Sequence, residues 1–133
     1  MSDLNPLHTQ VAGSHYKNKK IQPVEFAMAN RLDPCSFSIL KYVTRHPEKG
    51  GAADLQKAFH FTQLRECLGT EKHLVRDWVV SMDEYCRANE LGSAETAILL
   101  DLALWLESHS PLYPSRIKNG IEALLLAKYS TDN

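Results

Sequence analysis

Several cationic side chains and a glycine pair occur close together in one short stretch of the chain. Lys41 and Arg45 are four residues apart, so they share one face of a helix. Lys49 follows in a loop, and Gly50-Gly51 directly precedes a new helix start, where free backbone N–H groups and the helix dipole favour an anion. This spacing predicts that Arg45 and Lys49 hold a phosphate with support from the backbone.

The same stretch also has a purely structural interpretation. Lys41 and Arg45 would complement the negative C-terminal end of their own helix. Gly50-Gly51 would be an interhelical turn, and Asp54 with Lys57 would be a solvated pair. Spacing alone leaves both interpretations open.

Charge is distributed unevenly along the chain, although its net value is only -1. Residues 13–68 hold nine Lys or Arg against five Asp or Glu, a balance of +4, and residues 69–133 hold six against ten, a balance of -4. The net charge argues against a protein whose surface is covered in basic charge for binding nucleic acid, and we expect an anionic partner to bind the first half. The second half is interpreted as scaffold.

Common catalytic and metal-binding motifs are absent from the sequence. It contains no phosphate-binding G-x-x-x-x-G-K-[ST], no G-x-G-x-x-G, no H-E-x-x-H and no EF-hand loop. The six histidines include no i,i+3 or i,i+4 pair, so they are interpreted as isolated surface or partly packed residues. The three cysteines form no C-x-x-C pair, and the paired carboxylates of all-α nucleotide pyrophosphatases are not visible. No metal site is predicted.

Length and composition fit one soluble domain spanning residues 1–133. The chain has 133 residues, of which 44% are hydrophobic and 23% charged. No apolar run reaches the length of a membrane span, and the first ten residues do not form a secretory signal. We therefore expect a cytoplasmic protein.

Helix punctuation predicts an all-α fold, a compact bundle of five or six helices after an N-terminal arm of about 20 residues. Asp33 is a typical N-cap residue, and Pro34 is typical of the first helical position. Gly69 and Gly92 are typical of helix C-terminal ends. The predicted helices are Pro23 to Asn30, Cys35 to Arg45, Ala52 to Leu68, a fourth helix from its cap at Thr70 to Gly92, Ala94 to about Ser108, and about Ser115 to Tyr129, the last preceded by a turn framed by Pro111 and Pro114.

Two of the predicted helices carry further expectations. The fourth has the clearest amphipathic stripe, formed by Val75, Trp78, Val79, Met82, Tyr85 and Cys86. The fifth is apolar nearly all round, so we expect it to be central or shared between subunits, with Leu99, Leu102 and Leu106, or Ile98 and Trp105, in contacts of a homo-oligomer. Asp101 interrupts this apolar run and needs a partner such as Arg76, Arg87, Arg116 or Lys118.

A set of short motifs in residues 13–68 resembles the signature of a small bacteriophage family. The motifs are His15-Tyr16-Lys17, Ile21-Gln22-Pro23-Val24-Glu25-Phe26, Asn30 with Leu32-Asp33, Leu40-Lys41-Tyr42-Val43-x-Arg45, Lys49-Gly50-Gly51 and Asp54-Leu55-x-Lys57-Ala58. The family includes the P-loop-less nucleotide kinase of T-odd coliphages. The resemblance implies a phage-encoded nucleotide-binding protein of the host cytoplasm, with a deoxynucleoside monophosphate kinase as the preferred activity.

The resemblance also implies roles for individual residues. Phosphates would be held by Lys41, Arg45, Lys49, Gly50 and Lys57, and the base or sugar by His15 and Tyr16, with Lys17 and Gln22 as further ligand-binding residues. Asp54 or Glu25 would ligate magnesium or orient the acceptor. Because a small helical domain gives little room for two nucleotides, we expect a second subunit to complete the site.

Alternatives remain open for several of these residues and for the whole protein. Tyr42 is also compatible with a half-buried ring, and Glu25 and Asp54 with internal ion pairs to Lys41 or Arg45. The protein would otherwise be a non-catalytic binder that sequesters a nucleotide or a nucleotide-derived host defence signal, or an adaptor that inhibits a host protein.

Overall fold

The computed structural model describes residues 5–8, 20–69 and 73–130, and all regular elements in this part of the chain are helical. The all-α prediction is therefore confirmed. A short 3₁₀ turn spans Pro6–His8, and the α-helices are α1 (Pro23–Asn30), α2 (Pro34–Arg45), α3 (Gly51–Leu68), α4 (Met82–Ala88), α5 (Ser93–Glu107) and α6 (Leu112–Tyr129).

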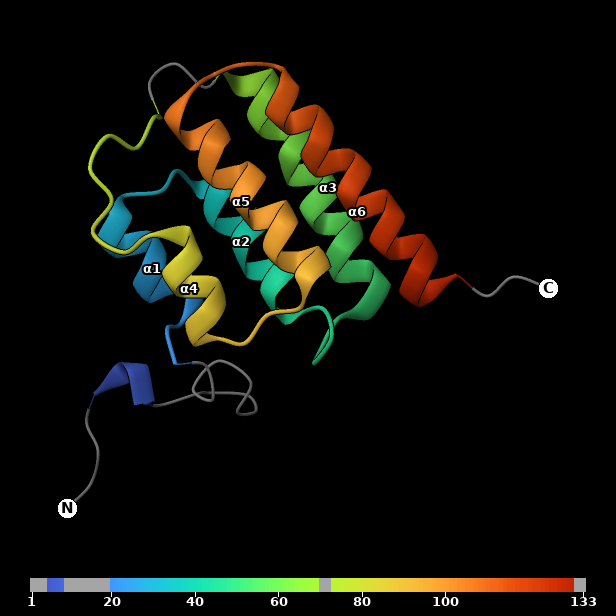
Figure 1. The fold of residues 1–133 in the computed structure, drawn as a ribbon, viewed down its shortest axis with the longest axis horizontal. Coiled ribbons are helices and arrows are strands. Elements are labelled where there is room, and N and C mark those ends of the chain that lie inside the picture. The colour runs from blue at the N-terminus through green and yellow to red at the C-terminus, as the bar shows by residue number, and fades with distance from the viewer. Residues whose placement is uncertain (1–4, 9–19, 70–72, 131–133) are drawn as a thin grey trace.

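The helices form two layers of three. Helices α1, α2 and α3 make one layer, and α4, α5 and α6 make the other, with α5 lying across α2 and α6 beside α3 (Figure 1). Contacts between α2 and α5 and between α3 and α6 join the layers, and Phe26 of α1 meets Tyr85 of α4 with ring centroids 4.8 Å apart. The layers thus correspond to the basic and the acidic halves of the sequence.

The predicted starts of α1 and α2 are confirmed. Pro23 takes the first position of α1, and the Glu25 carboxylate accepts the Gln22 N–H at 3.3 Å. Asp33 caps α2, accepting the Ser36 N–H at 2.9 Å. Burial raises the pKa of Asp33, but the Ser36 hydrogen bonds and the charge of Arg65 outweigh it and hold that pKa below its usual value.

The predicted fourth helix is wrong over residues 73–81, which are irregular, while Thr70 lies outside the described residues. Helix α4 begins only at Met82, after the Ser81 side chain caps it. The backbone of the irregular segment binds other parts of the fold instead. The Asn30 side chain accepts the N–H groups of Val79 and Val80 and donates to the Val80 carbonyl, at 2.8 to 3.2 Å. These tertiary bonds replace the helical ones that the apolar spacing predicted.

Helix α5 is central, which is one of the two arrangements that the sequence predicted, and the homo-oligomer stays a prediction. Leu99, Leu102, Leu106, Ile98 and Trp105 are all buried within the single chain, so their burial does not require a second subunit. Leu100 and Leu104 on α5 are exposed. The expected partner of Asp101 is present, because Arg116 Nε donates to Asp101 Oδ1 at 3.0 Å.

Helix α6 starts three residues earlier than predicted. It begins at Leu112, and Pro114 lies in its first turn, where the missing N–H costs no helical hydrogen bond. Gly120 lets α6 approach α5 closely, since a Cβ at this position would lie 2.9 Å from Ile98 Cγ1. Across the described residues, no helix combines the length and the apolar character needed to cross a bilayer.

Candidate functional site

Three cationic side chains from two helices meet around one aromatic ring. The Nζ atoms of Lys41 and Lys57 lie 4.6 and 5.3 Å from the centroid of the Tyr42 ring, and Arg45 Cζ lies 4.8 Å from it. These distances fit cation–π contacts. We call Lys41, Tyr42, Arg45 and Lys57 the Tyr42 cluster, and three of the predicted phosphate ligands belong to it.

The antiparallel pairing of α2 and α3 brings this cluster together. Lys41 and Arg45 lie one helical turn apart near the end of α2, and Lys57 lies in the first half of α3. The chain reverses over residues 46–50, where the Arg45 carbonyl accepts the Glu48 and Lys49 N–H groups, each at 3.0 Å. Gly51 completes the reversal with a φ of 57°, a left-handed conformation that glycine adopts without steric cost. Tyr42 is half-buried, as its structural interpretation predicted, and its ring stacks on Phe61.

An ion pair with the buried Asp54 carboxylate fixes the position of Arg45 in the cluster. Arg45 donates from Nε to Asp54 Oδ2 at 2.9 Å and from Nη2 to Asp54 Oδ1 at 3.2 Å. Asp54 is 1% exposed, and its Oδ2 also accepts the Gly50 N–H at 3.0 Å. The Gly50 position has no room for a side chain, because a Cβ there would lie 2.1 Å from the Asp54 carboxylate. The anion at this helix start is thus the protein's own Asp54, which forms the internal ion pair that the sequence left open.

A second polar network begins at the next residue, His46, and joins both layers. His46 Nε2 lies 2.6 Å from Glu95 Oε2, and His46 Nδ1 lies 2.7 Å from Tyr129 Oη. His46 and Glu95 are only 1% and 3% exposed, and Lys128 Nζ lies 3.8 Å from Glu95 Oε2. Burial lowers the pKa of His46 and outweighs the opposing effect of the Glu95 carboxylate. In the neutral ring, Nε2–H donates to Glu95 and Nδ1 accepts the Tyr129 hydroxyl.

This second network was missed by the sequence analysis. His46 had been interpreted as an isolated surface or partly packed residue, which is wrong, and Glu95 and Tyr129 fell in the half interpreted as scaffold. Their contacts with His46 span 49 and 83 residues of sequence. Periodicity and capping residues describe one helix at a time, so they cannot predict contacts between residues this far apart in sequence.

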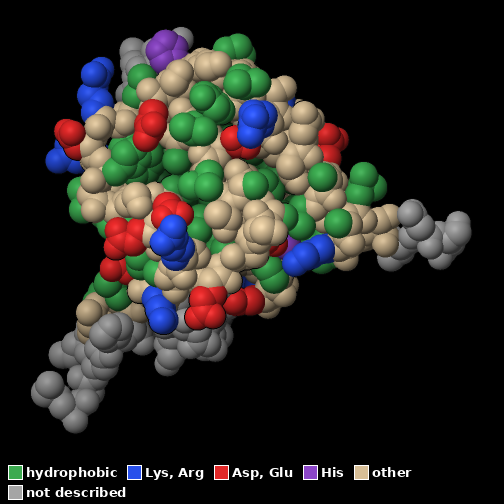
Figure 2. Space-filling view, in the orientation of Figure 1, with side chains coloured by type: hydrophobic (Ala, Val, Ile, Leu, Met, Phe, Trp, Pro, Cys, Tyr) green, Lys and Arg blue, Asp and Glu red, His purple; other side chains and the backbone are tan. Residues whose placement is uncertain are grey.

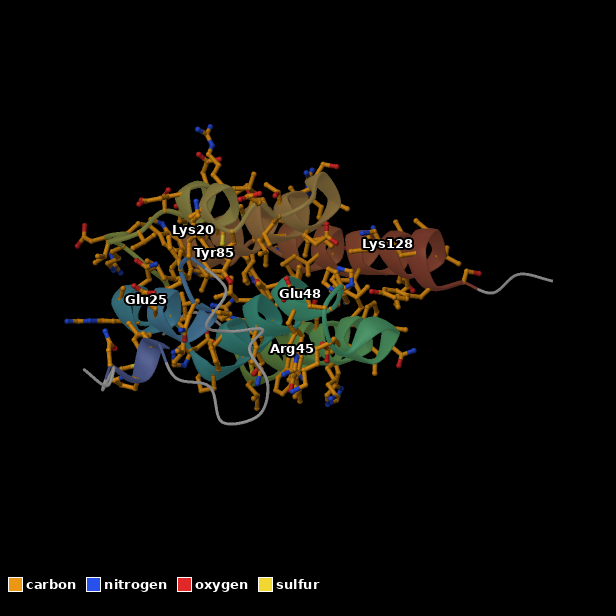
Figure 3. The ribbon with its side chains drawn as sticks, turned by 90° about the horizontal axis from the view of Figure 1, so that it is seen from below. Lys20, Glu25, Arg45, Glu48, Tyr85 and Lys128 are labelled. Atoms are coloured by element: carbon orange, nitrogen blue, oxygen red, sulfur yellow. The ribbon has the colours of Figure 1, made fainter. Side chains whose placement is uncertain are left out.

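The remaining predicted site residues lie apart from the Tyr42 cluster or outside the described chain. Glu25 is exposed on α1, where it caps its own helix, and Figure 3 shows it apart from Arg45. Gln22 is buried beside it and donates to the Leu7 carbonyl. Lys49 is exposed in the loop. The stretch from His15 to Lys17 lies outside the described residues.

The described residues contain no group of three or more His, Cys, Asp or Glu side chains that could hold a metal ion. Both oxygens of Asp54 are engaged by Arg45, so a cation could reach this carboxylate only if that ion pair opened. The geometry of the Tyr42 cluster is therefore suited to an anion.

Comparison with known protein families gives a match on the part of the chain that carries the cluster. No curated protein and no solved structure matches the chain. Residues 10–63, fewer than half of the chain, match the model of a protein family of unknown function, DUF3310.

Proposed function

We propose that this protein binds a small phosphorylated ligand, with a nucleotide as the preferred class, at the Tyr42 cluster. The observation that carries the proposal is the convergence of Lys41, Arg45 and Lys57 on a single ring, at 4.6 to 5.3 Å. Like charges gathered around one ring repel each other, and a bound anion relieves that repulsion.

The two lysines are the donors that the cluster offers to a ligand. Among the described residues, neither Lys41 nor Lys57 forms an ion pair with a carboxylate. Arg45 directs Nε and Nη2 to Asp54, so it contributes charge and orientation more than a free guanidinium fork. Both ammonium groups lie within 5.3 Å of the Tyr42 ring centroid, so the charge of each would attract a phosphate bound at this ring.

Phosphoryl transfer is a second candidate, which the family resemblance of residues 13–68 supports. The reaction would transfer the γ-phosphoryl group of ATP to a deoxynucleoside monophosphate, with magnesium neutralising charge on the phosphates. Lys41 and Lys57 would hold the phosphate oxygens in either case. Asp54 would act on magnesium only after release from Arg45, so the geometry supports binding more directly than transfer.

Calorimetric titration with deoxynucleoside mono- and triphosphates, and with inorganic phosphate, tests the binding proposal. We expect Lys41→Ala and Lys57→Ala each to weaken nucleotide binding by about tenfold, the effect of losing one charge-assisted hydrogen bond. Lys118→Ala is the matched control, because Lys118 pairs with Glu66 near the other end of α3. Equal affinity in all four proteins, or no binding of any nucleotide, would overturn the proposal.

Turnover separates the two candidates. Purified protein is incubated with ATP, magnesium and each deoxynucleoside monophosphate, and diphosphate formation is measured by chromatography. Formation of the deoxynucleoside diphosphate that stops on addition of EDTA, and that is slower in Lys57→Ala, supports the kinase. Tight binding that persists in EDTA without product supports a binder that sequesters its ligand.

A further inference from the structure

An apolar groove runs along the outward face of α5, in the layer that does not carry the Tyr42 cluster. It has a volume of about 360 Å³ and lies between α5 and residues 78–83. Leu100, Ala103 and Leu104 form one wall, and Trp78 and Met82 form the other. Leu100 and Leu104 are four residues apart and are 37% and 42% exposed. Figure 2 shows hydrophobic side chains gathered on this face, with both acidic and basic side chains around them.

The groove is preformed in the isolated chain. Trp78 Nε1 donates to Glu107 Oε2 at 2.7 Å, and the Trp78 ring lies 6.1 Å from the Phe26 ring between centroids. Met82 is buried at the start of α4, held there by the Ser81 cap. A fixed aromatic ring beside aliphatic side chains is the usual composition of an energetically important contact in protein interfaces. Binding of a ligand would therefore cost little conformational entropy in the side chains of the groove.

Among the described residues, the two charged ones that line the groove are both acidic. They are Asp83, whose Oδ2 also pairs with Nε of the exposed Arg87 on α4 at 3.0 Å, and Glu107, which accepts the Trp78 indole N–H. This disfavours a symmetric contact between two copies, which would press one acidic, concave surface against another. An occupant with basic residues is favoured by the same field.

We propose that this groove binds an amphipathic helix of another protein, whose apolar stripe is flanked by lysine or arginine. The apolar side chains of the helix would enter between Leu104 and Trp78. Its basic residues would lie opposite Glu107 and would compete with Arg87 for Asp83. This is the helix-in-groove mode of recognition, in which apolar anchors recur at three- and four-residue spacing. The proposal does not depend on the nucleotide-binding proposal, because no residue is shared between the two surfaces.

Fluorescence anisotropy with two synthetic helical peptides tests it on the full-length chain. Both peptides carry leucine at three- and four-residue spacing, one among lysines and the other among glutamates. We expect the leucine–lysine peptide to bind at least about tenfold more tightly than the leucine–glutamate peptide. Leu104→Lys should weaken binding of the leucine–lysine peptide by about tenfold or more, because it places a charge within the apolar wall.

Leu126→Lys is the matched control, since Leu126 is 71% exposed on α6 and lies outside the groove. Glu107→Gln keeps an acceptor for the Trp78 indole while removing one charge, and should weaken only the electrostatic part of the affinity. Equal binding of both peptides, or equal loss in Leu104→Lys and Leu126→Lys, would overturn the proposal. Light scattering that shows a dimer in the wild type and a monomer in Leu104→Lys would overturn it too, because the occupant would then be a second copy.

Discussion

Two neighbouring residues, Arg45 and His46, organise the polar interior of this protein. The Arg45 side chain pairs with Asp54 within one layer, while His46 reaches Glu95 and Tyr129 in the other. The turn that follows α2 is therefore fixed from two directions, which keeps Arg45 beside Tyr42. Removing either polar partner would leave a buried group without its hydrogen bond, a change that costs about 1–3 kcal/mol.

The lowered pKa of His46 predicts a pH dependence of stability. Below about pH 6.5, the unfolded chain takes up a proton on this residue more readily than the folded chain does. The free energy of unfolding should therefore fall with decreasing pH through this range, by at most about 1.4 kcal/mol per pH unit from this one group. Urea unfolding across this range should show a shallower slope in His46→Gln than in the wild type.

His60→Gln is the control for this measurement, because His60 is exposed on α3. It should keep the slope of the wild-type protein. A slope that is the same in His46→Gln and in the wild type would show that His46 does not titrate differently in the folded and unfolded chains.

At the scale of elements, sequence reasoning succeeded where a local signal fixes the helix. Asp33 with Pro34 and the glycine at 69 marked real helix boundaries, and α1, α2, α3 and α5 lie within two residues of the predicted ranges. It failed at residues 73–81, where Val75, Trp78 and Val80 pack against the core without forming a helix. The decisive group there is Asn30, some 50 residues away in sequence.

The candidate site, like the helices, could be predicted only where the signal is local. Lys41, Arg45 and Lys57 could be placed together because one hairpin of helices carries them all. The His46 network depends on how the two layers pack, and the sequence contains no local record of that packing.

The role of Asn30 leads to a prediction for the irregular segment. Asn30→Ala removes three hydrogen bonds and leaves the N–H groups of Val79 and Val80 without their acceptor. We expect the free energy of unfolding to fall by about 2 kcal/mol. Amide exchange at residues 79 and 80 should accelerate more than exchange in α2.

Asn119→Ala, an exposed position on α6, is the matched control and should change neither quantity appreciably. If exchange at residues 79 and 80 stayed as slow as in the wild type, Asn30 could not be what holds this segment.

Viewed as a whole molecule, the protein separates its charges between two packed layers. The half with a balance of +4 provides α1 to α3, and the half with a balance of -4 provides α4 to α6. Both proposed surfaces follow from this separation, since the Tyr42 cluster belongs to the basic layer and the groove to the acidic one. A ligand and a protein partner of opposite charge could thus bind at the same time without competing.

Close packing of α5 on α6 gives a prediction for global stability. Gly120→Val places a branched side chain where even a Cβ would lie 2.9 Å from Ile98 Cγ1, and Ile98 is buried. Because the core cannot absorb this volume without shifting a helix, we expect a loss of about 2–3 kcal/mol in chemical denaturation.

Ala127→Val lies on the same helix at an exposed position and should cost only its difference in helix propensity, about 0.5 kcal/mol. A Gly120→Val protein no less stable than Ala127→Val would mean that α5 and α6 do not pack as closely as described.

The contact between Tyr129 and His46 also has a consequence for the order of events during synthesis. The ribosome releases residues 20–69 long before it has made residue 129, so the helical hairpin of α2 and α3 can form while the hydroxyl that bonds to His46 does not yet exist. Until then the turn beside Arg45 lacks one of its two anchors. The Tyr42 cluster should therefore reach its final geometry only after translation has passed Tyr129, and the proposed anion binding would begin only then.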